Sequence, residues 1–248
     1  ALQSAYRGFK VIVAQALSTA QPEYTKVAMI IPSSARSEDY GWLGNIPRMR
    51  EWVGDRVIQN LTAAGFTIKN KDWELTIGVD RNDIEDDALG VYRPLFEMMG
   101  NSAAIHPDDL IFALLKAGFT TVCYDGQYFF DVDHPDGNGN VQSNKGTEAL
   151  SVTSYGTARS IMMALKDDNG NPLKILPDLL VCGPANDKTA REILFAEMIS
   201  NNTNVYRNTA ELLIRPELGN EWFLMDTKKP IKPMIFQQRK KPEFVALD

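Results

Sequence analysis

An alternation of apolar and polar side chains between residues 66 and 79 restricts the fold of this chain most strongly. Trp73, Leu75, Ile77 and Val79 alternate with polar residues or glycine, the two-residue repeat of a strand with one buried face. Residues 66–69 repeat this alternation before Asn70. The pattern predicts a long β-hairpin that turns near Asn70. Because two strands alone are only marginally stable in water, the hairpin requires a partner, which could be another subunit.

Two helices are expected after this hairpin. The second begins at Pro107 and ends at Gly118, and we expect a kink or break near His106 because proline clashes with the carbonyl four residues earlier. The first has its apolar residues mostly on one helical stripe. These residues are Ile84, Ala88, Leu89, Val91, Tyr92, Leu95, Phe96 and Met99. Its early acids, Asp83, Glu85, Asp86 and Asp87, favour interaction with the helix dipole over a metal site.

The remaining chain mixes helices and strands without a regular βαβ alternation, which predicts an α+β fold. Residues 1–40 contain a short amphipathic stretch and then Ser/Thr/Pro-rich chain, so we interpret them as an arm rather than a core element. The later elements are expected as follows: a helix at 153–166, a strand at 175–181, a helix at 188–200 capped by Asn186 or Asp187, and β segments at 211–215 and 221–226.

Composition excludes several classes of protein. The 248 residues suffice for one large domain or two small ones, and no apolar run approaches the roughly 20 residues of a membrane helix. The first residues do not resemble a signal peptide. Cys123 and Cys182 are too few for a disulfide framework, which predicts reduced, buried thiols. A net charge of −6 argues against nucleic-acid affinity of the whole surface, but a local basic patch remains possible.

One segment, residues 124–135, carries groups that could perform chemistry. Asp125, Asp131, Asp133 and His134 could ligate a metal, and a metal-dependent hydrolase is therefore the alternative function. Their spacing does not match the calcium-binding EF-hand loop, because proline occupies a ligand position in either register. We interpret the segment as a turn-bounded aromatic stretch in which Phe129 and Phe130 pack. We therefore predict no catalytic residue, no metal and no cofactor.

The last 20 residues are basic, with Lys228, Lys229, Lys232, Arg239, Lys240 and Lys241 in or just before them. Such a tail could contact DNA phosphates, but it lacks interleaved aromatic residues, so a solvated face is the favoured interpretation. An arm, a long hairpin and the lack of a recognisable catalytic motif favour a structural or assembly role over catalysis.

The stretch SEDYGWLGNIPRMREWVGDR, residues 37–56, resembles a signature of the Mu-like bacteriophage major head subunit family. Further similar segments follow in the family's order along nearly the whole chain. They are WELTIGVDRNDIEDDALGVY, HPDDLIFALLKAGF, YDGQYFFDVDHP, PDLLVCGPANDKTAREIL and KPMIFQQRKKPEF. The family continues past this last segment with a β-rich stretch that the present sequence does not include.

The resemblance implies the tailed-phage major capsid fold of the Hong Kong 97 type. By this likeness residues 1–40 would form the N-terminal arm and 41–82 the extended β-hairpin loop. Residues 83–119 would contain the spine helix of the peripheral domain, 120–215 would be mainly the axial domain, and 216–248 would return to the peripheral domain.

The resemblance also implies a non-enzymatic shell protein of the virion, assembled in the cytoplasm of the bacterial host. Its copies would form the pentamers and hexamers of an icosahedral capsid around double-stranded DNA bound without sequence specificity. Portal, scaffold or protease, and decoration proteins are further possible partners, and a membrane is not expected. Candidate intersubunit contacts are Trp42, Trp52, Arg56, Phe66 and Trp73, because aromatic residues and arginine are enriched at interfaces.

Overall fold

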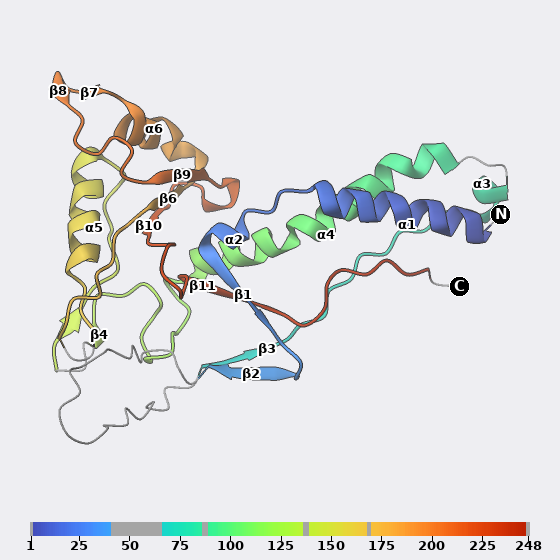
Figure 1. Cartoon of the computed structure of the whole chain (residues 1–248), viewed down its shortest axis with the longest axis horizontal. Helices are drawn as coiled ribbons and strands as arrows, with labels where there is room; N and C mark the ends of the chain where they lie inside the picture. The colour runs from blue at the N-terminus through green and yellow to red at the C-terminus, as the bar shows by residue number, and fades with distance from the viewer. Residues whose placement is uncertain (1, 41–65, 86–88, 136–138, 168–169, 247–248) are drawn as a thin grey trace, which may run out of the picture.

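A body of sheet and helices continues into a long pair of helices that extends away from it (Figure 1). The computed structural model describes residues 2–40, 66–85, 89–135, 139–167 and 170–246. The first and last described segments lie together at the far end of the helix pair, where the hydroxyl of Tyr6 donates to the carbonyl oxygen of Phe244. Within these described ranges, no helix has the length and apolar character needed to cross a membrane.

The central sheet has three short strands in the order β10–β6–β9. Strand β6 (Leu179–Cys182) runs parallel to β9 (Glu211–Ile214) and antiparallel to β10 (Trp222–Met225). Helix α6 (Asp187–Phe195) connects the two parallel strands, so one βαβ unit is present although no regular alternation runs through the chain. The β9 and β10 segments and the mixed fold class are confirmed.

Both faces of this sheet are buried. Leu179 and Val181 point into one core, and Leu180 and Cys182 point into a second core on the other side. This explains why β6 is a continuous apolar run, since a strand covered on both faces has no solvent side. The first core lies against α4, and α6 and α5 (Val152–Ala164) contribute to the second. The α5 helix matches the expected one, whereas β6 begins four residues later than predicted and α6 ends five residues earlier.

Helix α4 (Leu89–Ala117) is one continuous helix of 29 residues, so the predicted break near His106 is wrong. Both Pro94 and Pro107 lie inside it. Its two halves pack into different cores: Phe96 into a core with α1, and Phe112 into the core of the central sheet. Packing at both ends of the helix offsets the local cost of the prolines. The predicted end at Gly118 is confirmed.

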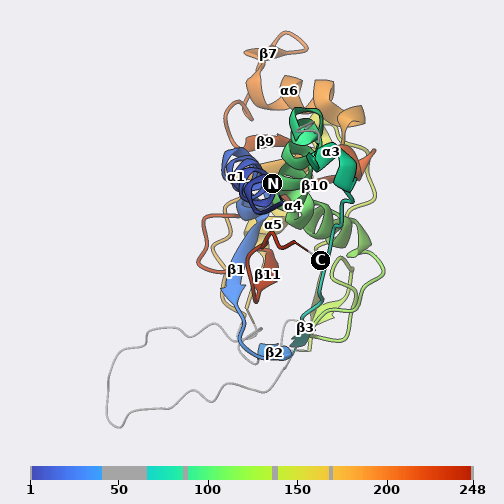
Figure 2. The same cartoon turned by 90° about the vertical axis from the view of Figure 1, so that its right-hand side faces the viewer.

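The first 40 residues contribute more to the core than an arm would. Helix α1 (Leu2–Thr19) lies along α4, as the end-on view shows (Figure 2), and the rings of Phe9 and Phe96 stack with centroids 3.9 Å apart. After it, α2 (Tyr24–Val27) places Val27 in the sheet core with no exposed surface. The interpretation of this whole segment as an arm is therefore wrong for α2 and the start of β1.

The predicted hairpin is also wrong in its pairing. Strand β3 (Phe66–Lys69) pairs antiparallel with β2 (Ser37–Tyr40), and residues 70–80 form no strand. Ile77 and Val79 instead pack against the core between α1 and α4. Their two-residue alternation therefore reflects an extended segment with one side on helices. Residues 41–65, between β2 and β3, lie outside the described residues.

The basic tail contains a strand that the sequence did not indicate. β11 (Met234–Gln238) pairs parallel with β1 (Ala28–Pro32), which joins the two ends of the chain. The remaining elements are short: α3 (Arg81–Glu85), β4 (His134–Pro135), β5 (Val141–Gln142), β7 (Met198–Ile199), β8 (Asn202–Thr203), and 3-10 turns at Pro184–Asn186 and Pro216–Leu218.

Gly183, at the end of β6, is required by close backbone packing. A Cβ atom at this position would lie 1.8 Å from the carbonyl oxygen of Gly219. Because backbone cannot rotate away as a side chain can, we expect Gly183→Ala to lower the free energy of unfolding by about 1–3 kcal/mol. Urea denaturation measures the loss, and Gly146→Ala, where a Cβ meets nothing within 4 Å, is the control. Equal effects of the two changes would contradict the argument.

Candidate assembly surfaces

An exposed apolar stripe runs along the outer side of α4. We call Val91, Leu95, Met98 and Ile105 the α4 stripe. Their spacing of four, three and seven residues places them on one side of the helix. Val91 is 79% exposed, Met98 68%, Leu95 40% and Ile105 36%. A row of large apolar side chains in water is typical of a surface that another protein covers.

The neighbouring face of the same helix is buried. Tyr92, Phe96 and Met99 follow three of the stripe residues by one position and pack in the core with α1. One residue step rotates a side chain by about 100° around a helix, so the two faces lie side by side. The sequence interpretation placed Val91 and Leu95 on the same helical stripe as Tyr92, Phe96 and Met99. The structure separates the two faces, and among the described residues only the face with Tyr92, Phe96 and Met99 is covered by the chain itself.

Trp73 provides a further exposed apolar group near the end of this stripe. Its side chain is 58% exposed, and its ring meets the ring of His106 edge-on with centroids 4.6 Å apart. His106 directly follows Ile105 of the stripe. Of the other predicted contact residues, Phe66 is half-buried in β3, and Trp42, Trp52 and Arg56 lie outside the described residues.

A second exposed apolar group lies at the tip of the body, far from the chain ends (Figure 1). The β7–β8 hairpin forms this tip, and Phe195, Met198 and Val205 in and around it are exposed. Asn204 holds the base of the hairpin, because its buried amide donates to the carbonyl oxygens of Ile193 and Ala196. The tip is therefore a fixed apolar projection.

A buried ionic network joins the helix pair to the body. The carboxylate of Asp108, on α4, accepts hydrogen bonds from the backbone N–H groups of Glu23 and Tyr24 at 2.9 and 2.6 Å. The Arg215 guanidinium lies 3.2 Å from the same carboxylate and 2.7 Å from that of Glu217. It also covers the ring of Phe112 at 4.3 Å. Three segments far apart in the sequence are thus fixed to one another.

The protonation states in this network follow from its contacts. Burial acts to raise the pKa of Glu217, but the hydrogen bond and charge of Arg215 and a backbone hydrogen bond together outweigh it, so the pKa is lowered. The pKa of Glu23 is lowered in the same way, with hydrogen bonds from Lys26 and Arg215 outweighing burial. The pKa of Arg215 is raised, because hydrogen bonds with Glu217 and Glu23 outweigh its burial. These acids and the arginine are therefore charged at neutral pH.

The acidic side chains of residues 124–135 form hydrogen bonds with different partners and do not converge on one point. Asp125 lies 2.6 Å from Nδ1 of His134, whereas Asp131 accepts from the backbone N–H of Val132. In the described part of the chain, no three potential ligands of the His, Cys, Asp and Glu types form a cluster able to hold a metal. Phe129 and Phe130 pack against the core of the central sheet, as predicted.

The two cysteines differ in burial. Cys182 is buried in β6, and burial, with a smaller effect of the Asp187 charge, raises the pKa of its thiol to about 11. Cys123 is only half-buried, which corrects the expectation that both are buried, and burial raises its pKa as well. Neither thiol is activated as a nucleophile, because that requires a lowered pKa.

Solved structures identify the class of protein. The chain superposes on the procapsid protein of bacteriophage JBD30 with a TM-score of 0.73 and 32% identity, covering 88% of this chain and 97% of that one. The match to the JBD30 capsid has a TM-score of 0.68 and 31% identity over 81% and 92% of the two chains. A further JBD30 capsid, decorated with minor capsid protein trimers, matches with a TM-score of 0.66. The fold is that of a tailed-phage major capsid protein.

Sequence comparison gives the particular family. The model of the Mu-like prophage major head subunit gpT matches residues 2–149, 145–218 and 215–248, and the chain belongs to this family. The major capsid protein of Escherichia phage Mu is 37% identical over 230 residues, 93% of this chain and 56% of that protein. The Mu-like prophage FluMu major head subunit of Haemophilus influenzae is 33% identical over 97% of this chain and 59% of that protein. The chain thus spans a little over half the length of these relatives.

Proposed function

We propose that this chain builds the icosahedral shell of a Mu-like phage or prophage head by self-assembly, as a structural protein and not as an enzyme. Its family, and its likeness over most of its length to chains from a capsid and a procapsid, support this role. The copies form pentamers and hexamers around double-stranded DNA. The virion is its final location, and assembly takes place in the cytoplasm of the bacterial host.

The α4 stripe is the observation within the molecule that carries this proposal. An isolated soluble chain gains nothing by presenting Val91 and Met98 to water, whereas a subunit buries them against a neighbour. We propose that Trp73 and Phe66 also contact neighbouring copies. Trp42, Trp52 and Arg56 belong to the loop that reaches the neighbouring copy.

The division of the chain follows from the same role. Residues 1–40 form the N-terminal arm together with its anchor in the body, and 41–82 form the extended loop, whose base is the β2–β3 pair. Residues 83–119 carry the spine helix, 120–215 are mainly the axial domain, and 216–248 return to the peripheral domain. The apolar tip at β7–β8 lies in the axial part and suits a contact around a local symmetry axis. Portal, scaffold or protease, and decoration proteins are further partners of this shell.

Negative-stain electron microscopy of the purified chain and of lysates that express it tests the proposal. We expect rings of capsomers or closed shells of uniform size. A protein that remains monomeric under all conditions of salt and concentration would contradict native self-assembly. Elemental analysis of chelator-free protein is the companion measurement, because stoichiometric zinc or manganese would instead support the hydrolase alternative.

A further inference from the structure

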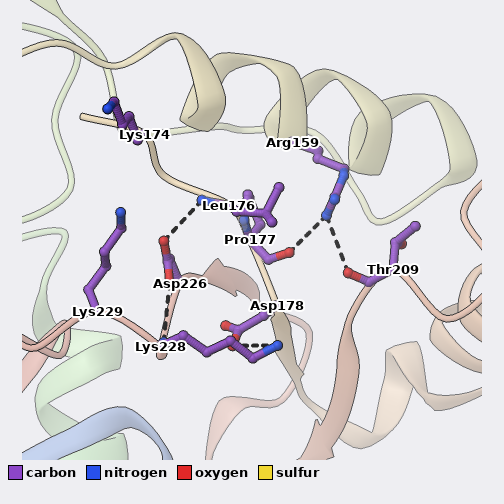
Figure 3. A pocket seen from close by; sticks show the side chains of 9 residues that line it. All are labelled: Arg159, Lys174, Leu176, Pro177, Asp178, Thr209, Asp226, Lys228 and Lys229. Carbon is purple, nitrogen blue, oxygen red and sulfur yellow. Dashed lines mark hydrogen bonds and ion pairs between the residues drawn. The ribbon is translucent and has the colours of Figure 1, made fainter. Parts of the chain in front are cut away.

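A basic hollow lies at the edge of the central sheet where β6 and β9 begin and β10 ends (Figure 3). It is lined by side chains from α5, from the segment before β6, and from the segment after β10. Four of these carry positive charge: Arg159, Lys174, Lys228 and Lys229. The chain as a whole has a net charge of −6, so this local concentration of positive charge differs from its average surface.

The two acids in the hollow, Asp178 and Asp226, accept hydrogen bonds from the backbone of the hollow itself. Asp226 accepts hydrogen bonds from the backbone N–H groups of Leu176 and Lys228, and Asp178 accepts from the N–H of Thr227 at 2.8 Å. Their carboxylates thus hold the walls of the hollow together. Among the described residues, only Lys228 is within ion-pair distance of either acid, at 3.8 Å from Asp178, and its side chain is largely exposed.

Arg159 is fixed in the hollow by the backbone. One terminal nitrogen of its guanidinium donates to the carbonyl oxygens of Pro177 and Thr209, at 2.8 and 3.3 Å. Carbonyl oxygens do not neutralise the cation, and no acid pairs with it among the described residues. Its remaining N–H groups stay available to an anion. A guanidinium fixed in this way is already oriented as a donor. Binding a ligand therefore costs less side-chain conformational entropy than it would with a mobile arginine.

Two ammonium groups complete the hollow on the side opposite Arg159 (Figure 3). Lys174 and Lys229 are exposed, and within the described residues neither has a hydrogen-bond or ion-pair partner. Lys174 has a positive φ of 54°, in the left-handed region that a residue with a Cβ rarely adopts. Backbone strain of this kind persists where the surrounding structure enforces it, and it is more frequent at functional sites.

We propose that this hollow binds the phosphate backbone of nucleic acid. An oriented guanidinium and ammonium groups on two other segments match the phosphate oxygens of a polyanion, which Arg and Lys contact without reading sequence. The positive charges are spread over three segments. They therefore match a ligand with several successive phosphates better than a ligand with a single carboxylate. The proposal rests on the proposed shell function in one respect: the double-stranded DNA that the shell encloses is taken as the source of the phosphates.

The test compares two double variants of the full chain in binding to a short fluorescent DNA duplex. Lys174→Ala/Lys229→Ala removes two charges from the hollow. Lys240→Ala/Lys241→Ala, the tail variant, removes two charges from the exposed part of the basic tail that follows β11 and lies outside the hollow. Anisotropy is measured between about 50 and 200 mM salt. We expect the hollow variant to reduce the slope of log affinity against log salt by about 2, and to weaken binding at the lowest salt by at least about ten-fold. The tail variant is expected to change both by much less.

A second measurement follows the lysines themselves. The duplex should protect Lys174 and Lys229 from acetylation in the unaltered chain, and the urea midpoint of the variant should match that of the parent. The proposal is overturned if the tail variant loses as much affinity as the hollow variant, or if neither lysine is protected. It is equally overturned if an acidic peptide with the sequence of residues 80–87, and not the duplex, binds through the two lysines. None of these outcomes depends on shell formation, which electron microscopy reports separately.

Discussion

Replacing Met98 with aspartate is expected to abolish shell assembly and leave the isolated chain folded. The Met98 side chain is 68% exposed, so a charge at this position remains hydrated in the monomer. We expect the free energy of unfolding to change by no more than about 0.5 kcal/mol. In an assembled shell the same carboxylate would be buried without a partner, at a cost of several kcal/mol per contact. Because every subunit repeats the contact, the penalty accumulates over the whole particle.

Sedimentation velocity and particle counts from electron micrographs measure this effect, and urea denaturation measures stability. Arg93→Gln is the matched control, because it changes the net charge by the same amount at an exposed position of α4 that lies two residues past Val91 and so on another side of the helix. Val91→Asp should reproduce the loss at a second stripe position. Normal shells from the Met98 variant would show that the stripe is not an interface. Loss of particles in the Arg93 variant as well would point to a general effect of charge on α4.

Local sequence patterns correctly predicted two kinds of element: helices whose ends are marked by nearby residues, and short strands that are runs of apolar residues. The helix at 152–164 was predicted to begin at 153. Its N-cap Ser151, whose hydroxyl accepts from the N–H of Ser154, is a local signal that the prediction did not use. β9 and β10 are short apolar runs and were found within a residue. The end of α4 was found because Gly118 follows it directly.

Pairings between distant segments could not be predicted in this way. The parallel pairing of β1 with β11 joins Ala28 to Met234, and nothing in either segment specifies the other. The alternation at residues 73–79 was assigned to a hairpin because a period of two is the same for a strand and for an extended segment on a helical surface. Pro107 predicted a break because local sequence does not show the packing that holds both halves of α4.

The assembly surfaces were predicted only in part. Trp73 was identified from its aromatic character and is exposed next to α4. The α4 stripe was missed, because Val91 and Leu95 are as apolar as Tyr92 and Phe96, and hydrophobicity alone does not tell which face of a helix its own chain covers. The partners of Asp108 were also invisible, since Arg215 lies 107 positions away in sequence.

Removing the carboxylate of Asp108 is expected to cause a large loss of stability. Its side chain is only 4% exposed and accepts from two backbone N–H groups and from Arg215. In Asp108→Ala the N–H of Tyr24 is left buried without an acceptor, and the Arg215 guanidinium loses a buried counter-charge. Breaking a buried, hydrogen-bonded ion pair from one side costs about 3–5 kcal/mol. Urea denaturation followed by tryptophan fluorescence measures the change.

The adjacent Asp109 provides the control, because it is exposed and its replacement by alanine should change the free energy of unfolding by no more than about 0.5 kcal/mol. Asp108→Asn separates the two causes. It keeps an oxygen that can accept from Tyr24 and loses only the charge, so an intermediate loss is expected. If all three variants were equally stable, the network would not hold α2 and Arg215 to α4. If only Asp108→Ala were destabilised, the side-chain oxygen that accepts from the backbone N–H groups would contribute to stability and the negative charge would not.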